Sequence, residues 1–265
     1  MIQLLDDSSV EVRERVEADL LSLGMRLPGM LALHWEELDA PSQIIVKDAL
    51  PSLRMAWFEH EWLGFLDQDH EGLALESAMT ALSYLRGGLA KPPLGPMLDD
   101  LAMGFSASGL ACTEQNLVSW ILKEKGFGPP IQDYYSWKNS DLVEVILRRE
   151  GLQISLAVLI ILIGNRVGLS FFGLNVPRHF LLATNVGDRG LAFDVFHRGA
   201  EIPASELNRQ IQAVHSDLNW LSYKATPTLI VARVLRNLIR ATQEEKESDW
   251  SQRLERYLSL LPLSG

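Results

Sequence analysis

The chain has 265 residues, of which 47% are hydrophobic and 22% are charged. Both fractions are ordinary for globular proteins, so composition excludes a disordered chain and a fibre. The net charge of −10 disfavours nucleic acid as a partner, because an acidic surface repels phosphate backbones. A single cysteine, Cys112, can form no internal disulfide, which favours a reducing, cytoplasmic location.

The first part of the chain is predicted to be helical. Apolar residues recur every three or four positions from Val12 to Leu23, after Pro41, and again over residues 75–85. The N-terminus has no basic segment ahead of an apolar stretch, so we expect no secretory signal. These segments resemble stacked helices of the HEAT kind.

Helices also dominate the middle of the chain. The proline-rich residues 91–96 separate them from the first part. Apolar spacing, N-cap residues and terminal glycines then predict helices at about 97–108, 114–125, 141–150 and 154–167. The last of these contains the most apolar run, which is too short for the roughly 20 residues of a bilayer span. We therefore expect a buried helix and no membrane segment.

Short strands follow Gly168. Runs rich in aromatic and aliphatic residues predict strands at 171–176, 179–184 and 191–196. A two-residue turn at Gly187-Asp188 would pair residue 179 with residue 196, whereas a register shifted by one pair would place 179 opposite 194. Helices resume from residue 205, and residues 228–261 form a helix pair with the length of one tetratricopeptide repeat.

Three side chains fit the roles of a catalytic triad. Ser155 lies in the first turn of the buried helix, where unpaired backbone N–H groups favour a developing negative charge. His179 begins the second strand and Asp194 lies near the end of the third, so a hairpin would bring them close. Together they would supply a nucleophile, a base and a group that orients the base.

Four motifs occur in a fixed order through the middle of the chain. They are residues 134–151, 154–157, 177–181 and 193–196. They resemble the bacterial transglutaminase-like family described as invasion-gene (Sir-type) regulators, over roughly residues 70–215. This family commonly adds tetratricopeptide-like helices at its C-terminus.

The resemblance implies an α+β fold. Its core would be transglutaminase-like or papain-like, a buried helix with a short antiparallel sheet, flanked by N-terminal and C-terminal helices. We expect a HEAT-like helical part, a transglutaminase-like domain and a tetratricopeptide-like helical extension, at residues 1–69, 70–215 and 216–265. Ser155 would stand where an enzyme of this kind has its cysteine, with His179 and Asp194 as the histidine and the acid.

Four further residues are candidates for the cleft: Gln153, Ile154, Trp137 and Asn139. Backbone amides at Ile154, with the side chain of Gln153, could hold an oxyanion. Trp137 and Asn139 match positions of the family and could shape the cleft. A packed aromatic ring and a loop cap are the alternative roles for this pair.

Serine at position 155 weakens the case for catalysis. A thiol is partly ionised near neutral pH, whereas a hydroxyl depends on a well-placed base. We therefore favour a non-catalytic or regulatory protein-interaction module that keeps the Ser-His-Asp network and binds a protein or peptide. The alternative is a serine-dependent hydrolase or acyltransferase acting on an amide or ester, in which His179 deprotonates Ser155 and Asp194 orients His179.

The remaining polar residues offer weaker candidates. No base lies near Cys112 in the sequence, so we expect a small buried residue there. His197 is an alternative imidazole, although a surface position at a strand end is expected. No group of histidines, cysteines and carboxylates shows metal-ligand spacing, so we predict no metal and no cofactor.

Overall fold

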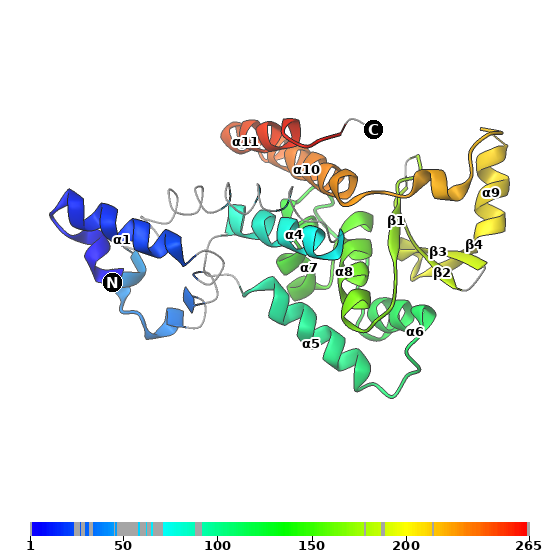
Figure 1. Ribbon diagram of the computed structural model, residues 1–265, viewed down its shortest axis with the longest axis horizontal. Coiled ribbons are helices and arrows are strands. Elements are labelled where there is room, and N and C mark those ends of the chain that lie inside the picture. Colours follow the sequence, from blue (N-terminus) through cyan, green and yellow to red (C-terminus); the bar gives the residue numbers. More distant parts are fainter. Residues whose placement is uncertain are drawn as a thin grey trace.

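The computed structural model describes most of the chain. The described residues are 2–23, 27, 30–31, 34–44, 46, 58, 62, 65, 71–87, 92–177, 179–186, 189–213 and 215–263. The helix α1 (Val10–Ser22) lies at one end of the long axis, and a small sheet lies at the other (Figure 1). The helix predicted directly after Pro41 falls largely outside the described residues, so the HEAT-like arrangement stays a prediction.

The helices between these ends agree with the predicted order. They are α4 (Glu71–Gly87), α5 (Leu94–Ser106), α6 (Glu114–Ser119), α7 (Leu142–Arg148) and α8 (Gln153–Arg166). Thr113 caps α6 as predicted, and a π-helical turn at Trp120–Glu124 extends that helix. Gly168 follows α8 with a φ of 77°, a left-handed conformation that glycine adopts without strain.

The helix α8 occupies the centre of the fold (Figure 1). Every residue from Ile154 to Gly164 is buried. A helix that is apolar on all sides is stable in water only when other elements surround it. The main core therefore forms around α8, and it includes apolar residues from α4 to α8, from one face of the sheet and from the C-terminal helices.

The sheet is antiparallel with the strand order β1-β2-β3-β4. Its strands are β1 (Phe172–Leu174), β2 (Leu181–Val186), β3 (Arg189–Asp194) and β4 (Ala200–Pro203). Side chains alternate between its two faces, because successive residues of a strand point in opposite directions. Leu182 and Phe193 face the core around α8, while Ala183 and Ala192 belong to a second cluster with α9 (Ala204–Gln212).

Two features of the sheet test the predictions directly. Val186 pairs with Arg189 and Leu182 with Phe193, which is the first of the two predicted registers, while the turn predicted at Gly187-Asp188 lies outside the described residues. The pairing ends before residues 179 and 196, because β2 begins at Leu181 and β3 ends at Asp194. The fourth strand, β4, was not predicted. Its residues are mostly exposed, and it ends at Pro203, which lacks an N–H group and is tolerated at a sheet edge.

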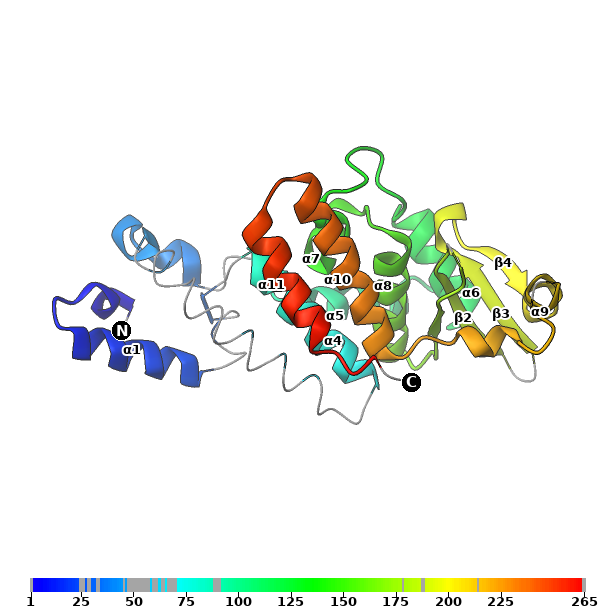
Figure 2. The same cartoon turned by 90° about the horizontal axis from the view of Figure 1, so that it is seen from above.

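The C-terminal helix pair is confirmed as α10 (Pro227–Glu244) and α11 (Ser248–Ser259), which lie side by side in both views (Figure 2). Both helices contribute to the main core. The α+β class is confirmed by this mixture of helices with one small antiparallel sheet. The division into three parts and the likeness to a tetratricopeptide repeat stay predictions.

One arginine connects three helices. Arg166, at the end of α8, donates hydrogen bonds to both carboxylate oxygens of Glu76 on α4 at 2.8 Å and to Asp99 on α5 at 2.6 Å. The hydrogen bond to Glu76, opposed by partial burial, raises the pKa of Arg166 above its ordinary value, and Asp99 adds to this increase. The ion pairs therefore help to hold α4 and α5 against the central helix.

We expect Arg166→Met to lower the free energy of unfolding by about 1.5 kcal/mol, because charge-assisted hydrogen bonds are lost while the aliphatic packing is largely kept. Urea denaturation of the two proteins measures this change. Arg15→Met is the control, since Arg15 is exposed and lies 3.9 Å from Asp19. Equal effects of the two substitutions would contradict a role for Arg166 in holding the helices.

Candidate functional site

Ser155 lies in the first turn of α8, as predicted, and is 1% exposed. Its Oγ donates a hydrogen bond of 2.9 Å to the backbone carbonyl of Asn139. The N-cap residue Leu152 offers no side-chain cap to the first backbone N–H groups of the helix. The hydroxyl proton of Ser155 is therefore directed to the loop before α7.

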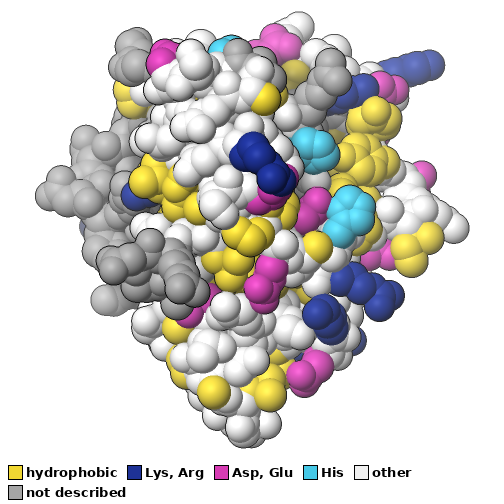
Figure 3. Space-filling view, turned by 90° about the vertical axis from the view of Figure 1, so that its right-hand side faces the viewer, with side chains coloured by type: hydrophobic (Ala, Val, Ile, Leu, Met, Phe, Trp, Pro, Cys, Tyr) yellow, Lys and Arg dark blue, Asp and Glu magenta, His cyan; other side chains and the backbone are white. Residues whose placement is uncertain are grey.

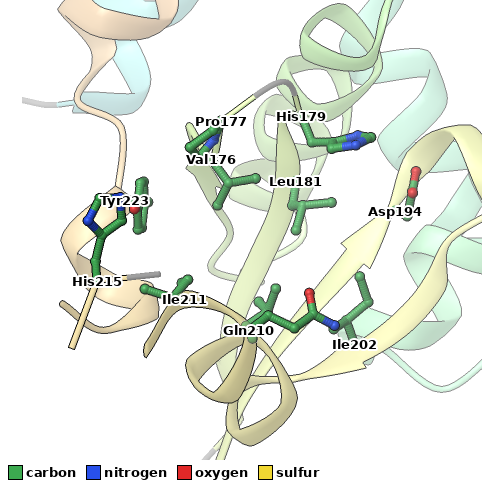
Figure 4. Close-up of a pocket in the computed structure, with 11 residues that line it drawn as sticks. Val176, Pro177, His179, Leu181, Asp194, Ile202, Gln210, Ile211, His215 and Tyr223 are labelled. Carbon is green, nitrogen blue, oxygen red and sulfur yellow. The ribbon is translucent and has the colours of Figure 1, made fainter. Parts of the chain in front are cut away.

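His179 lies two residues before β2 and is exposed. Its backbone N–H donates to the carbonyl of Val176 at 3.1 Å, and its own carbonyl accepts from Arg233 Nη1 at 3.4 Å. The imidazole lines a cavity of about 430 Å³ together with Asp194 (Figure 4). In the close-up the ring extends toward the side of the cavity where the carboxyl group of Asp194 lies.

Asp194 is the last residue of β3, and its carboxylate already has partners. Oδ1 accepts hydrogen bonds from the backbone N–H groups of Phe196 and His197, at 3.0 and 3.3 Å. Oδ2 lies 2.8 Å from Nδ1 of His197, whose side chain is exposed as predicted. The carboxylate thus caps the turn after β3 and pairs with the alternative imidazole.

The structure brings two of the three triad candidates to one cavity. His179 and Asp194 both line it, but Ser155 does not. Among the described residues, no hydrogen bond joins the Ser155 hydroxyl to the imidazole of His179, or that imidazole to Asp194. A working triad would need Ser155 to leave Asn139 and Asp194 to leave His197, so the triad stays a prediction.

The two oxyanion candidates lie beside a second, smaller pocket of about 140 Å³. Gln153 and Ile154 form one side of it, at the start of α8. Oε1 of Gln153 accepts a hydrogen bond of 3.4 Å from the backbone N–H of Phe180. Gln153 thus connects the start of α8 to the segment that carries His179.

Asn139 and Trp137 lie in a short 3₁₀ turn (Trp137–Asn139) that precedes α7. Asn139 is 0% exposed, and its Nδ2 donates to the carbonyls of Asp133 and Tyr134, at 2.9 and 3.1 Å. Its Oδ1 accepts from Arg148 at 3.1 Å. Trp137 is half-buried and packs against the main core. Asn139 and Trp137 line neither the cavity beside His179 nor the pocket beside Gln153.

Two arginines of α10 were not among the predicted site residues. Arg233 and Arg240 line the smaller pocket opposite the start of α8. Arg233 also donates a hydrogen bond to Oδ1 of Asn175. Their spacing from Arg236, at intervals of three and four residues, places all three cations along one side of the helix. That spacing was the sequence signal that could have found them.

Other candidates are placed away from these pockets. Cys112 is exposed, and its Sγ lies 3.4 Å from the carbonyl of Val167, so the prediction of a buried residue is wrong. The reason is its position in the loop between α5 and α6, outside any helix face. Within the described ranges, no cluster of histidine, cysteine and carboxylate side chains could hold a metal ion. Over the same ranges, none of the helices is long and apolar enough to cross a bilayer.

Comparisons with known proteins identify the superfamily. A family model described as the transglutaminase-like superfamily matches residues 96–236, which include α8, the sheet and the start of α10. This match covers more than half of the chain, so the chain belongs to the transglutaminase-like superfamily.

Curated relatives are similar over part of their length. A "UPF0162 protein" of Xylella fastidiosa (strain 9a5c) is 32% identical over 151 residues, 54% of this chain and 54% of that protein. A protein of the same name from Vibrio cholerae is 30% identical over 100 residues, 37% of this chain and 33% of the relative. Human "F-box only protein 21" is 36% identical over 64 residues, 24% of this chain and 10% of that protein. The chain thus spans about half the length of the first of these relatives, and no solved structure matches it significantly.

Proposed function

We propose that this chain is a non-catalytic, transglutaminase-like module that binds a protein or peptide partner. The observation that carries the proposal is the hydrogen bond from the buried Ser155 hydroxyl to the carbonyl of Asn139. A serine nucleophile must give its proton to a base as it attacks. In this structure the proton is held by a backbone carbonyl, which cannot act as that base.

The arrangement of the imidazoles supports the same proposal. Asp194 pairs with His197, so the carboxylate is not hydrogen-bonded to the ring of His179. In a triad, the acid fixes the tautomer and the orientation of the base. Without that hydrogen bond, the carboxylate does not fix the tautomer of His179, which lines the cavity without the orientation that a catalytic base needs.

The cavity beside His179 is suited to binding. Its volume of about 430 Å³ falls in the range of ligand sites, and apolar residues such as Leu181 and Ile202 line it together with His179, His215 and Tyr223. On the face at the sheet end of the molecule, histidine side chains lie among hydrophobic ones (Figure 3). Exposed apolar side chains combined with a few polar groups are typical of interaction sites.

Kinship with the invasion-gene (Sir-type) regulators is part of this proposal. It is supported by the four motifs that occur in order in the sequence. Two of them, residues 154–157 and 193–196, contain Ser155 and Asp194. A regulator acts by binding. This kinship and the hydrogen bond from Ser155 to Asn139 therefore both support a binding module over an enzyme.

A serine-directed fluorophosphonate probe tests the proposal. We expect no labelling of the wild-type chain and none of Ser155→Ala, because the hydroxyl is buried and has no base. Gel fluorescence and intact mass measure the label, with an active serine hydrolase as the positive control for the probe. Labelling of the wild-type chain that disappears in Ser155→Ala would overturn the proposal. It would establish the alternative, a serine-dependent hydrolase or acyltransferase.

A further inference from the structure

Among the described residues, the charged side chains that line the smaller pocket, at the start of α8, are all positive. Arg233 and Arg240 line it, and its other polar side chains include Gln153 and Asn237, which are uncharged. No carboxylate is among the described residues that line it. The pocket is thus locally cationic in a chain whose net charge is −10.

Neither of these arginines forms an ion pair within the described part of the chain. Arg148 and Arg166 show the contrast, because each pairs with a carboxylate at 2.9 Å or less. Cations that lack a carboxylate in a predominantly acidic protein are available to an anion from outside.

Uncharged groups hold the two guanidinium groups in place. The guanidinium of Arg240 lies 4.2 Å from the ring centroid of Tyr135, and that of Arg233 lies 5.5 Å from the ring centroid of Phe180. Arg233 also donates to Asn175 and to the carbonyl of His179. Stacking and hydrogen bonds of this kind orient the guanidinium groups before any ligand binds, which lowers the entropy cost of binding.

Partial burial makes an anionic ligand favourable at Arg233. Burial lowers the pKa of Arg233, a decrease that Tyr134 opposes and the nearby charge of Arg236 reinforces. The charged form therefore carries a desolvation cost that no carboxylate of the pocket offsets. A bound anion would offset that cost.

We propose that this pocket binds a carboxylate side chain of an acidic peptide. This inference rests on the proposed binding function and specifies the chemistry of the partner. Guanidinium groups match planar oxyanions through paired hydrogen bonds. The pocket holds only about 140 Å³, and a planar carboxylate is smaller than a tetrahedral phosphate group, so we take the carboxylate as the ligand and the phosphate as an outcome of the test.

The loop beside the pocket adds apolar contacts for such a peptide. Tyr134 and Tyr135 line the pocket and are exposed, and their rings meet edge to face. Ile131, on the same loop, is 85% exposed. An acidic residue next to a hydrophobic one could therefore contact the arginines and this loop together.

Fluorescence anisotropy with two short labelled peptides tests the proposal. One contains Glu-Leu-Glu in Gly-Ser flanks, and the other contains Gln-Leu-Gln in the same flanks. We expect the full chain to bind the Glu peptide about tenfold more tightly than the Gln peptide. Arg240→Gln should weaken binding of the Glu peptide about tenfold, since charge-assisted hydrogen bonds are lost.

Arg236→Gln is the matched control. It removes the same charge from the same helix, but Arg236 does not line the pocket. We expect this variant to change the affinity by less than about twofold, because Arg236 does not line the pocket and its exposed charge is screened by salt. Arg236 and Arg240 are both exposed, so we expect both variants to fold, and thermal unfolding checks this.

Three results would overturn the inference: equal affinities for the two peptides, equal weakening by Arg236→Gln and Arg240→Gln, or tighter binding of a phosphoserine peptide than of the Glu peptide. A failure of this inference can be distinguished from a failure of the proposed function, because the two are measured by different experiments. Labelling of Ser155 by the phosphonate probe reports on catalysis alone. A chain that is neither labelled nor able to prefer the Glu peptide would lose this inference and keep the proposal that it is non-catalytic.

Discussion

Asn139→Ala is expected to lower the free energy of unfolding by about 3 kcal/mol, the largest effect we predict for a single site. The side chain is fully buried, donates to the carbonyls of Asp133 and Tyr134, and accepts from Arg148. Alanine removes all three hydrogen bonds. It leaves the carbonyls of Asp133 and Tyr134 without these donors at a buried position, while Arg148 keeps its ion pair with Glu150.

Urea denaturation measures the change, and Asn116→Ala is the matched control. Asn116 also donates from Nδ2 to a backbone carbonyl, that of Ala111 at 2.9 Å, but it is only half-buried. Water can replace its hydrogen bond, so a loss below about 1 kcal/mol is expected. A loss for Asn139→Ala no larger than this control would show that Asn139 does not organise the loop.

Asn139→Asp adds a second test of the same idea. The change keeps an acceptor for Arg148 but replaces the Nδ2 donor by an oxygen facing the carbonyls of Asp133 and Tyr134. Three oxygens without protons would then lie close together, so aspartate should be at least as destabilising as alanine. Recovery of wild-type stability in Asn139→Asp would contradict the assigned hydrogen bonds.

Local signals in the sequence were sufficient for much of the fold. The length and apolarity of residues 154–167 predicted the central helix, and the turn at Gly187-Asp188 predicted the β2–β3 register. Both features depend on residues close together in the chain. The strand β4 escaped prediction because it has only four residues, and these are mostly exposed and include no run of aromatic or aliphatic side chains, so its place in the sheet comes from pairing with β3.

The site could be predicted only in part, for the same reason. The hairpin register brought His179 and Asp194 toward one cavity. Hydrogen-bond partners depend on orientation, which spacing does not determine. Asp194 therefore pairs with His197, three residues away, and Ser155 bonds to a carbonyl sixteen residues away. Arg233 and Arg240 reach the pocket from a helix far along the chain, so no local pattern linked them to Gln153.

Gly173→Ala tests whether close packing fixes the segment that carries His179. Gly173 lies in β1 opposite Leu182, and a Cβ atom there would come within 2.3 Å of Cζ of Phe180. Phe180 is buried beneath Arg233 and next to His179 in the sequence. Its ring has little room to move, so we expect a loss of about 2 kcal/mol in the free energy of unfolding.

Gly128→Ala is the control for the loss of a glycine, because no atom lies within 4 Å of the added Cβ. We expect this change to alter stability by less than about 0.5 kcal/mol. A comparable loss in both variants would mean that the chain backbone, and not the ring of Phe180, resists the substitution at Gly173.

A double-mutant cycle separates the clash from every other cause. Phe180→Leu removes the part of the ring that the new methyl group would meet, although it leaves a cavity of its own. If the clash is the cause, Gly173→Ala should cost at least about 1 kcal/mol less in the Phe180→Leu background than in the wild type. Additive losses would place the strain elsewhere in the β1–β2 pair. The position of the segment before β2, and with it the imidazole of His179, would then not depend on the fit between Gly173 and Phe180.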